Sequence, residues 1–252
     1  MTARPVVDCP PVALPIYPGS TPIWDALLEL SSDLVHPEWT LIGGQMVMLH
    51  AAENGAAPLR VSRDLDVVVN ARVATGALRR FADSLQQRGF DLTGASPDGI
   101  AHRYTRGQAS IDLLAPEGLG RNADLTTTPP GRTLQVPGGS QALDRTEMVP
   151  VAHAGQQGFV PRPSLLGAII VKAAAVSVDD APRAQELDLA LLLSMVTDPA
   201  ALSAEMTRKD RKRLRRVGLG CSDHQAWSAF DPDTADRARL AYRYMTDAPS
   251  LS

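Results

Sequence analysis

Two aspartates separated by one residue, Asp64 and Asp66, are the side chains of this sequence best placed to bind a metal ion. They open the segment 64–69, whose three closing valines are typical of a β-strand. Side chains two apart on a strand point to the same face, so both carboxylates project together. Such a pair of hard oxygen donors suits Mg²⁺, which keeps several waters and is completed by substrate phosphates. The alternative is a solvated strand end without a metal.

A pair of glycines, Gly43 and Gly44, precedes these aspartates, with 19 residues (45–63) between them. An apolar run ends at the glycines, and apolar residues recur at helical spacing after them, which predicts a strand, a glycine turn and a helix. Glycines allow close approach of the backbone, and the first amides of a helix can hold a phosphate. Ser62 and Arg63, just before the aspartates, are further candidates for binding a nucleotide.

The order of these motifs, Gly43-Gly44 and then Arg60-x-Ser62-x-Asp64-x-Asp66, resembles the signature of the minimal nucleotidyltransferases of the DNA polymerase β superfamily. It is most similar to the AbiEii/MenT group of toxin nucleotidyltransferases. The resemblance covers about residues 39–192 and implies transfer of a nucleotide from an NTP to an acceptor hydroxyl, with two Mg²⁺ ions. It also implies an RNA acceptor such as the tRNA 3′ end, a role in a toxin-antitoxin system, and an antitoxin partner.

The resemblance further implies a third carboxylate on a strand beside the Asp-x-Asp strand. Residues 110–114 are predicted to form that strand, and Asp112 is the acidic residue placed to join Asp64 and Asp66 as a metal ligand. The alternative is that Asp112 caps the loop beyond Pro116.

Two charged residues stand in apolar helices of the second half. Lys172 interrupts an apolar helix, where an ammonium is costly unless it reaches water or meets an anion, and Asp188 heads another apolar stretch. The toxin family is similar in carrying a lysine and an Asp-Leu pair here, which implies catalytic roles for both residues and phosphate binding by Lys172. The sequence departs from the family at Ala184-Gln185, where a Lys-Asp pair is usual. The alternative to a functional role of Lys172 is that its side chain simply reaches the surface.

The segment 208–216 carries seven basic residues in nine positions. A helical arrangement would group some of them into a stripe spaced for phosphates, without the means to read bases. A solvated helix face is the alternative. The candidate RNA-binding residues of this stripe are Arg208, Arg211, Lys212 and Arg215.

Composition restricts the class of protein. In 252 residues, 44% are hydrophobic and 21% charged, as in a folded protein, while 4% aromatics argue against a platform that stacks single-stranded bases. A net charge of −3 makes any nucleic-acid contact local. Two distant cysteines without a metal motif indicate a reducing compartment. The proline-rich start does not resemble a signal peptide, and no apolar run approaches the ~20 residues of a membrane span, so we expect a cytoplasmic protein.

We therefore expect an α+β fold, with a nucleotidyltransferase-type mixed sheet flanked by helices and then a helical bundle. The predicted divisions are a proline-rich arm at 1–20, an α/β domain at 21–162 and a helical domain at 163–252. Glycines and prolines make 115–140 a loop region that we expect to border the site. Competing functions are nucleotidyl transfer to a small molecule or a protein side chain, a catalytically silent nucleotide-binding module, and a structural scaffold.

Overall fold

The central sheet contains the strand that carries the aspartates. The computed structural model describes residues 3–34, 38–72, 76–120, 122–179 and 182–247. Its six-stranded sheet has the order β2-β3-β6-β5-β4, with β7 paired to β6, and only the β3/β6 and β6/β7 pairs are parallel. The strands are β2 (Trp39–Ile42), β3 (Asp64–Val69), β4 (Asp91–Thr93), β5 (Arg103–Arg106), β6 (Ala109–Pro116) and β7 (Gln135–Val136).

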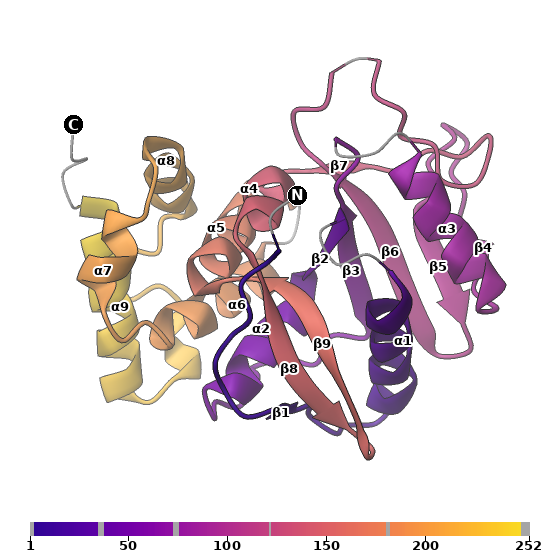
Figure 1. Ribbon diagram of the computed structural model, residues 1–252. Helices are drawn as coiled ribbons and strands as arrows, with labels where there is room; N and C mark the ends of the chain where they lie inside the picture. The colour runs from indigo at the N-terminus through magenta and orange to yellow at the C-terminus, as the bar shows by residue number, and fades with distance from the viewer. Residues whose placement is uncertain (1–2, 35–37, 73–75, 121, 180–181, 248–252) are drawn as a thin grey trace.

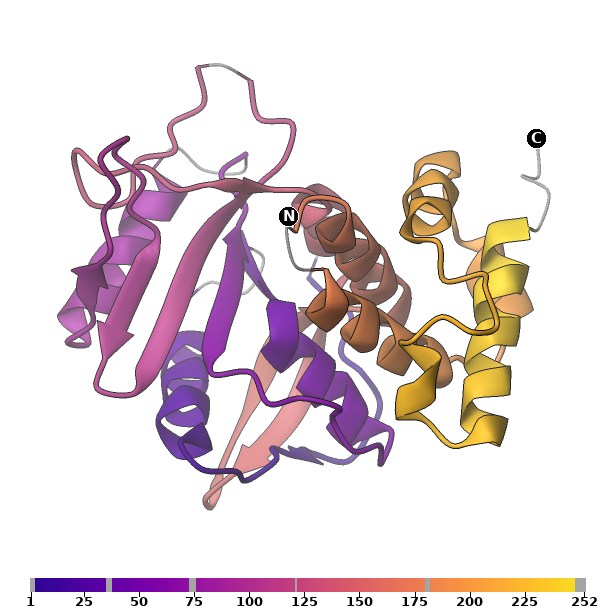
Figure 2. The same ribbon diagram turned by 180° about the vertical axis from the view of Figure 1, so that it is seen from behind.

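Two helices cover one face of this sheet. Helices α1 (Ser20–Asp33) and α3 (Ala77–Gln87) lie in front of it in Figure 1 and behind it in Figure 2. In α3, apolar residues recur at helical spacing and are buried, while most positions between them are exposed. The valines of β3 are fully buried because helices and neighbouring strands enclose that strand.

A second, smaller sheet lies beside the first and has the order β1-β8-β9. Strands β8 (Thr146–His153) and β9 (Gln156–Pro163) form a hairpin, and β1 (Val12–Ala13) pairs in parallel with β8. The hairpin turns at Ala154 and Gly155, both with positive φ, which suits the twist of the flanking strands. The proline-rich N-terminal segment is thus attached to the molecule through β1.

A buried ionic cluster joins this second sheet to α2 (Gly43–Glu53), the helix that follows the glycine pair. Arg162 on β9 is 1% exposed and contacts the carboxylates of Glu53 on α2 and Glu147 on β8. Its Nη1 also lies 2.8 Å from His50 Nε2 on α2. Removing one member would leave buried charge unpaired, so the cluster fixes α2 against the hairpin.

Helices make up the remainder of the chain. They are α5 (Leu165–Val176), α6 (Arg183–Ser194), α7 (Pro199–Ala204), α8 (Arg208–Val217), the 3₁₀ turn Trp227–Ala229 and α9 (Pro232–Asp247), and the short α4 (Gly139–Asp144) precedes the hairpin. The apolar α5 is buried over most of its length because α4, α6 and α8 pack around it. None of the described helices is both long and apolar enough to span a membrane. The predicted α+β class, a mixed sheet flanked by helices and followed by a helical half, is confirmed.

Candidate active site

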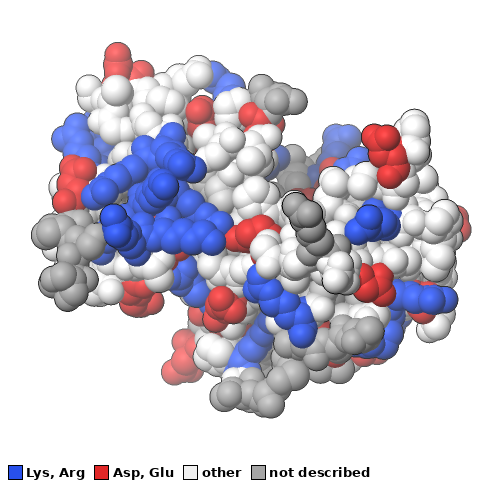
Figure 3. Space-filling model, turned by 90° about the horizontal axis from the view of Figure 1, so that it is seen from above, with Lys and Arg blue, Asp and Glu red and all other residues white. Residues whose placement is uncertain are grey.

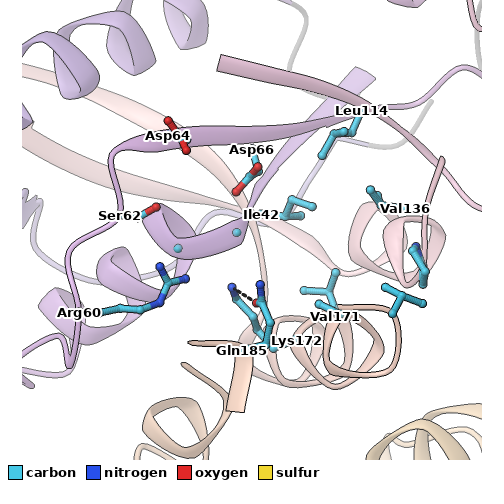
Figure 4. A pocket seen from close by; sticks show the side chains of 15 residues that line it. Ile42, Arg60, Ser62, Asp64, Asp66, Leu114, Val136, Val171, Lys172 and Gln185 are labelled. Atoms are coloured by element: carbon cyan, nitrogen blue, oxygen red, sulfur yellow. Dashed lines mark hydrogen bonds between the residues drawn. The ribbon is translucent and has the colours of Figure 1, made fainter. Parts of the chain in front are cut away.

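A cavity of about 320 Å³ lies where the end of β2, the start of β3 and helix α5 meet. One part of its wall is polar and contains Gly43, Gly44, Arg60, Ser62, Asp64, Asp66, Lys172 and Gln185. The other part is apolar and contains Ile42, Leu114, Val136, Pro137, Val171, Ala175 and Val178. Figure 4 shows the two carboxylates above, Lys172 with Gln185 below, and Leu114, Val136 and Val171 to the right. The loop region expected to border the site does so through Val136 and Pro137.

The glycine turn lies directly against the residues before and within β3. Gly43 has a φ of +71°, and a Cβ built on it would lie 1.8 Å from Asp66 Oδ2. A Cβ on Gly44 would lie 2.5 Å from the Cβ of Ser62. Helix α2 begins at Gly43, and no side chain caps its start. The first amides of α2 are therefore free to hold an anion beside the carboxylates.

Asp64 and Asp66 both line the cavity, as the strand alternation predicted. Burial raises the pKa of Asp66 to about 6, and the nearby Asp112 carboxylate contributes in the same direction. Lys172 opposes this rise because its charge favours the ionised carboxylate. With this pKa the Asp66 carboxylate is mostly ionised at neutral pH, and a bound divalent ion would lower the pKa further.

Asp112 lies beside Asp66 in the sheet, because the two residues are partners in the β3/β6 register. Both of its carboxylate oxygens, however, accept hydrogen bonds from Arg103 on β5, one from Nε and one from Nη2, each at 2.7 Å. Asp112 does not line the cavity. Among the described residues, no group of three or more His, Cys, Asp or Glu side chains could hold a metal ion. The role of Asp112 as a metal ligand stays a prediction.

The two charged residues of the apolar helices meet each other. Lys172 Nζ lies 2.8 Å from Asp188 Oδ2, and each residue is 3% exposed. Arg60 donates to both oxygens of the same carboxylate, from Nε at 2.9 Å and from Nη2 at 2.6 Å. Asp188 therefore orients two cations whose side chains line the cavity. With one carboxylate shared by two cations, this wall keeps one net positive charge toward a ligand.

Two residues of this wall were not singled out as binding residues from the sequence. Arg60 belongs to the motif itself, at the position two before Ser62, so its signal was present. Gln185 stands where the family pattern is broken, and its Oε1 accepts from Lys172 Nζ at 2.9 Å. In this chain Gln185 therefore helps to orient the lysine.

Ser62 and Arg63 separate in the structure. Ser62 lines the cavity, and its carbonyl oxygen accepts from Gln45 Nε2 at 2.7 Å and from the Tyr17 hydroxyl at 3.0 Å. Arg63 instead lines another hollow, beside Gly19 at the start of α1. Arg63, the residue before β3, therefore does not line this cavity, and its contact with a nucleotide stays a prediction.

The basic helix presents a different face from the predicted one. Lys209, Lys212, Arg213 and Arg216 line a hollow of about 420 Å³. That hollow and the cavity share Pro137 and Val178. Figure 3 shows lysine and arginine side chains gathered in one patch over the left part of the molecule, where α8 lies. We call these four residues the basic face of α8.

Of the four predicted RNA-binding residues, only Lys212 belongs to this basic face. Arg211 is 5% exposed and donates to the backbone oxygens of Ser203 and Met245, so it cannot form part of a surface stripe. Arg215 donates from Nε to the backbone oxygen of Thr246, and Arg208 is exposed but does not line the hollow. The structure therefore does not bring these four residues together on one surface, because Arg211 lies on the buried face of α8.

No protein-family model and no curated protein matches the chain. Among solved structures, the chain is similar to an antigenic nucleotidyltransferase-like protein from Paracoccidioides brasiliensis. The identity is 12%, the match covers 87% of this chain and 93% of that one, and the TM-score is 0.48. A likeness of this strength does not identify a reaction.

The glycine turn gives the first prediction. Gly43→Ala should weaken binding of Mg²⁺ with a non-hydrolysable NTP analogue by roughly tenfold to a hundredfold, because the new methyl group would displace the Asp66 carboxylate. Calorimetric titration measures this. Gly55→Ala is the matched control, since Gly55 also has positive φ (+64°) but nothing lies within 4 Å of the position that its new methyl group would take. Equal affinities in the two variants would contradict the close contact.

The shifted pKa of Asp66 gives the second prediction. Metal binding needs the ionised carboxylate, so Mn²⁺ affinity should fall about tenfold per pH unit below about 6, a step that Asp66→Asn should abolish. In the metal-free protein, by contrast, protonation of Asp66 favours the folded state. Its raised pKa adds stability that is complete below the ordinary value of 3.8 and is lost as pH rises through about 6. An Mn²⁺ affinity that does not change between pH 5 and 7 would contradict the assignment of Asp66 as a metal ligand.

Proposed function

We propose that this protein is a divalent-metal-dependent nucleotidyltransferase that transfers a nucleoside monophosphate from an NTP to an acceptor hydroxyl. The observation that most supports this proposal is that the glycine turn, the carboxylate pair and two oriented cations all line one cavity. Each component occurs in many proteins, but together they supply what nucleotidyl transfer requires. These requirements are amides for phosphate oxygens, hard donors for a cation and fixed positive charge for developing negative charge.

The donor set fits Mg²⁺. Asp64 and Asp66 offer hard carboxylate oxygens on one face of β3, and nearby phosphates could complete the coordination. When bound, the ion would neutralise phosphate charge and polarise the phosphorus that is attacked.

The remaining chemistry falls to side chains and amides of the chain. The start of α2 at Gly43 and Gly44 holds phosphate oxygens, while Arg60 and Lys172 neutralise them from the opposite wall. An acceptor oxygen forms a bond to the α-phosphorus as the bond to pyrophosphate breaks. The hydroxyl proton passes to a carboxylate. Asp66 is better placed for this than Asp112, because Arg103 occupies both oxygens of Asp112.

We further propose that the acceptor is RNA, such as the 3′ end of a tRNA. The basic face of α8 supports this, because its residues follow the helical spacing i, i+3, i+4 and i+7 and border a hollow that shares Pro137 and Val178 with the cavity. No aromatic residue lines that hollow among the described parts of the chain, which favours contacts to phosphates over stacked bases. The motif resemblance adds a toxin role in the cytoplasm, with a cognate antitoxin as partner.

Incubation with α-³²P-labelled NTPs tests this proposal. In a mixture of RNA, protein and small molecules, label should enter the RNA only when Mg²⁺ is present. Asp64→Ala should reduce incorporation by about a hundredfold or more, because several kcal/mol of charge stabilisation would be lost. Asp91→Ala, which removes an exposed aspartate of the same sheet, is the matched control and should retain wild-type incorporation.

The other outcomes are each informative. Label in protein or in a small molecule would refute the RNA acceptor while retaining the reaction. Thermal stabilisation by NTP and Mg²⁺ without any label would indicate a silent nucleotide-binding module. Wild-type incorporation by Asp64→Ala would refute the metal assignment.

Reversing charge on the basic face of α8 gives a prediction for the acceptor. Lys212→Glu with Arg216→Glu should weaken RNA binding about tenfold or more and reduce the slope of log affinity against log salt by about two. Fluorescence anisotropy over a salt series measures both quantities. Arg208→Glu with Arg243→Glu is the matched control, because it makes the same change in net charge at exposed residues outside the hollow. Equal losses in the two double variants would show that only overall charge matters.

A further inference from the structure

Three charged side chains form a row across the central sheet. Asp66 on β3 is the register partner of Asp112 on β6, and Asp112 is the register partner of Arg103 on β5. Directly opposed residues of an antiparallel pair have Cβ atoms about 5 Å apart on one face of the sheet. The contact between Arg103 and Asp112 is therefore set by strand pairing, in addition to side-chain rotation.

The Arg103 guanidinium closes Asp112 to other ligands. It donates from Nε and Nη2 to the two carboxylate oxygens, the bidentate geometry that makes arginine-carboxylate pairs strong. The Asp112 side chain is 10% exposed, so little of it remains open for another ligand. A metal ion at Asp112 would have to displace a guanidinium that is held on the neighbouring strand.

The same guanidinium lies beside the metal-binding pair. Arg103 Nη2 is 3.9 Å from Asp64 Oδ2, and the arginine side chain is 45% exposed. The three aspartates carry three negative charges when ionised, of which Arg103 balances one. The remaining two match a single divalent cation. Lys172 and Arg60 share the carboxylate of Asp188, so their wall adds one positive charge, which we assign to the phosphates of the nucleotide.

We propose that Arg103 replaces a second metal ion, so that the chain binds one divalent cation, at Asp64 and Asp66. This inference rests on the proposed nucleotidyl transfer and departs from the two-ion arrangement expected from the motif. Two-metal sites need carboxylates that serve both ions, whereas a fixed guanidinium can stabilise charge on a reacting phosphate without an ion. Arg103 thus positions Asp112 and supplies the second positive charge.

The test is the number of Mn²⁺ ions bound per chain with a saturating non-hydrolysable NTP analogue, measured by electron paramagnetic resonance and calorimetry. Wild type should bind one ion. Arg103→Gln should bind two, because Asp112 becomes free, and Arg103→Lys, which keeps the charge, should bind one. Arg106→Gln is the matched control on the same strand, since Arg106 pairs with Glu29, and it should bind one ion. Asp112→Asn should retain the single ion with affinity within about threefold, whereas Asp64→Asn should lose at least tenfold.

Several results would overturn the inference. Two ions in wild type, reduced to one in Asp112→Asn, would make Asp112 a ligand and Arg103 a group that the metal displaces. One ion in Arg103→Gln would mean that the guanidinium does not exclude the second ion. If Arg103→Gln does not fold, the wild-type count and Asp112→Asn decide the question. No ion in wild type with nucleotide would instead refute the proposed function.

Discussion

The contact between the glycine turn and β3 is the constraint on which the candidate site depends. Strands β2 and β3 are antiparallel, and Ile42, the residue before Gly43, is the register partner of Asp66. The turn therefore leaves β2 at the level of the Asp66 carboxylate, and only the absence of a side chain allows this approach. As a result, the first amides of α2 and the carboxylates of β3 face the same cavity. A cation and the phosphates it binds can then share one location.

The opposite wall depends on a single carboxylate. Asp188 pairs with Lys172 from α5 and with Arg60 from the segment before β3, so it joins the helical half to the sheet. Burying these charges is costly, and the cost is offset because every partner is close and well aligned. Residues on both sides of the domain boundary expected near 162 from composition line the cavity, so the site is formed by both halves of the chain. The helical half supplies part of the site.

Sequence patterns anticipated those residues whose positions follow from local geometry. Alternation along a strand placed Asp64 and Asp66 together, and the cost of a lone charge in an apolar helix indicated that Lys172 and Asp188 need partners. Arg63 precedes the first residue of β3, so its separation from Ser62 does not follow from strand alternation. The pairing of Arg103 with Asp112 could not be read from the sequence because it depends on strand register. In α8, by contrast, Leu214 and Val217 mark the buried face, and Arg211 lies one turn before Leu214 on that face, a signal that the basic run obscured.

The two chemically distinct parts of the cavity determine how a nucleotide would lie in it. Fixed charges and helix amides gather at Gly43, Asp66 and Lys172, so the triphosphate is expected there. The apolar part, which includes Val136 and Val178, carries no charged side chain. It offers the nucleobase an apolar surface against which its ring can pack. This part shares Pro137 and Val178 with the hollow beside the basic face of α8. A polyanionic acceptor held on α8 would therefore approach from the nucleobase end, so that its charge stays separated from the triphosphate until its hydroxyl reaches the α-phosphate.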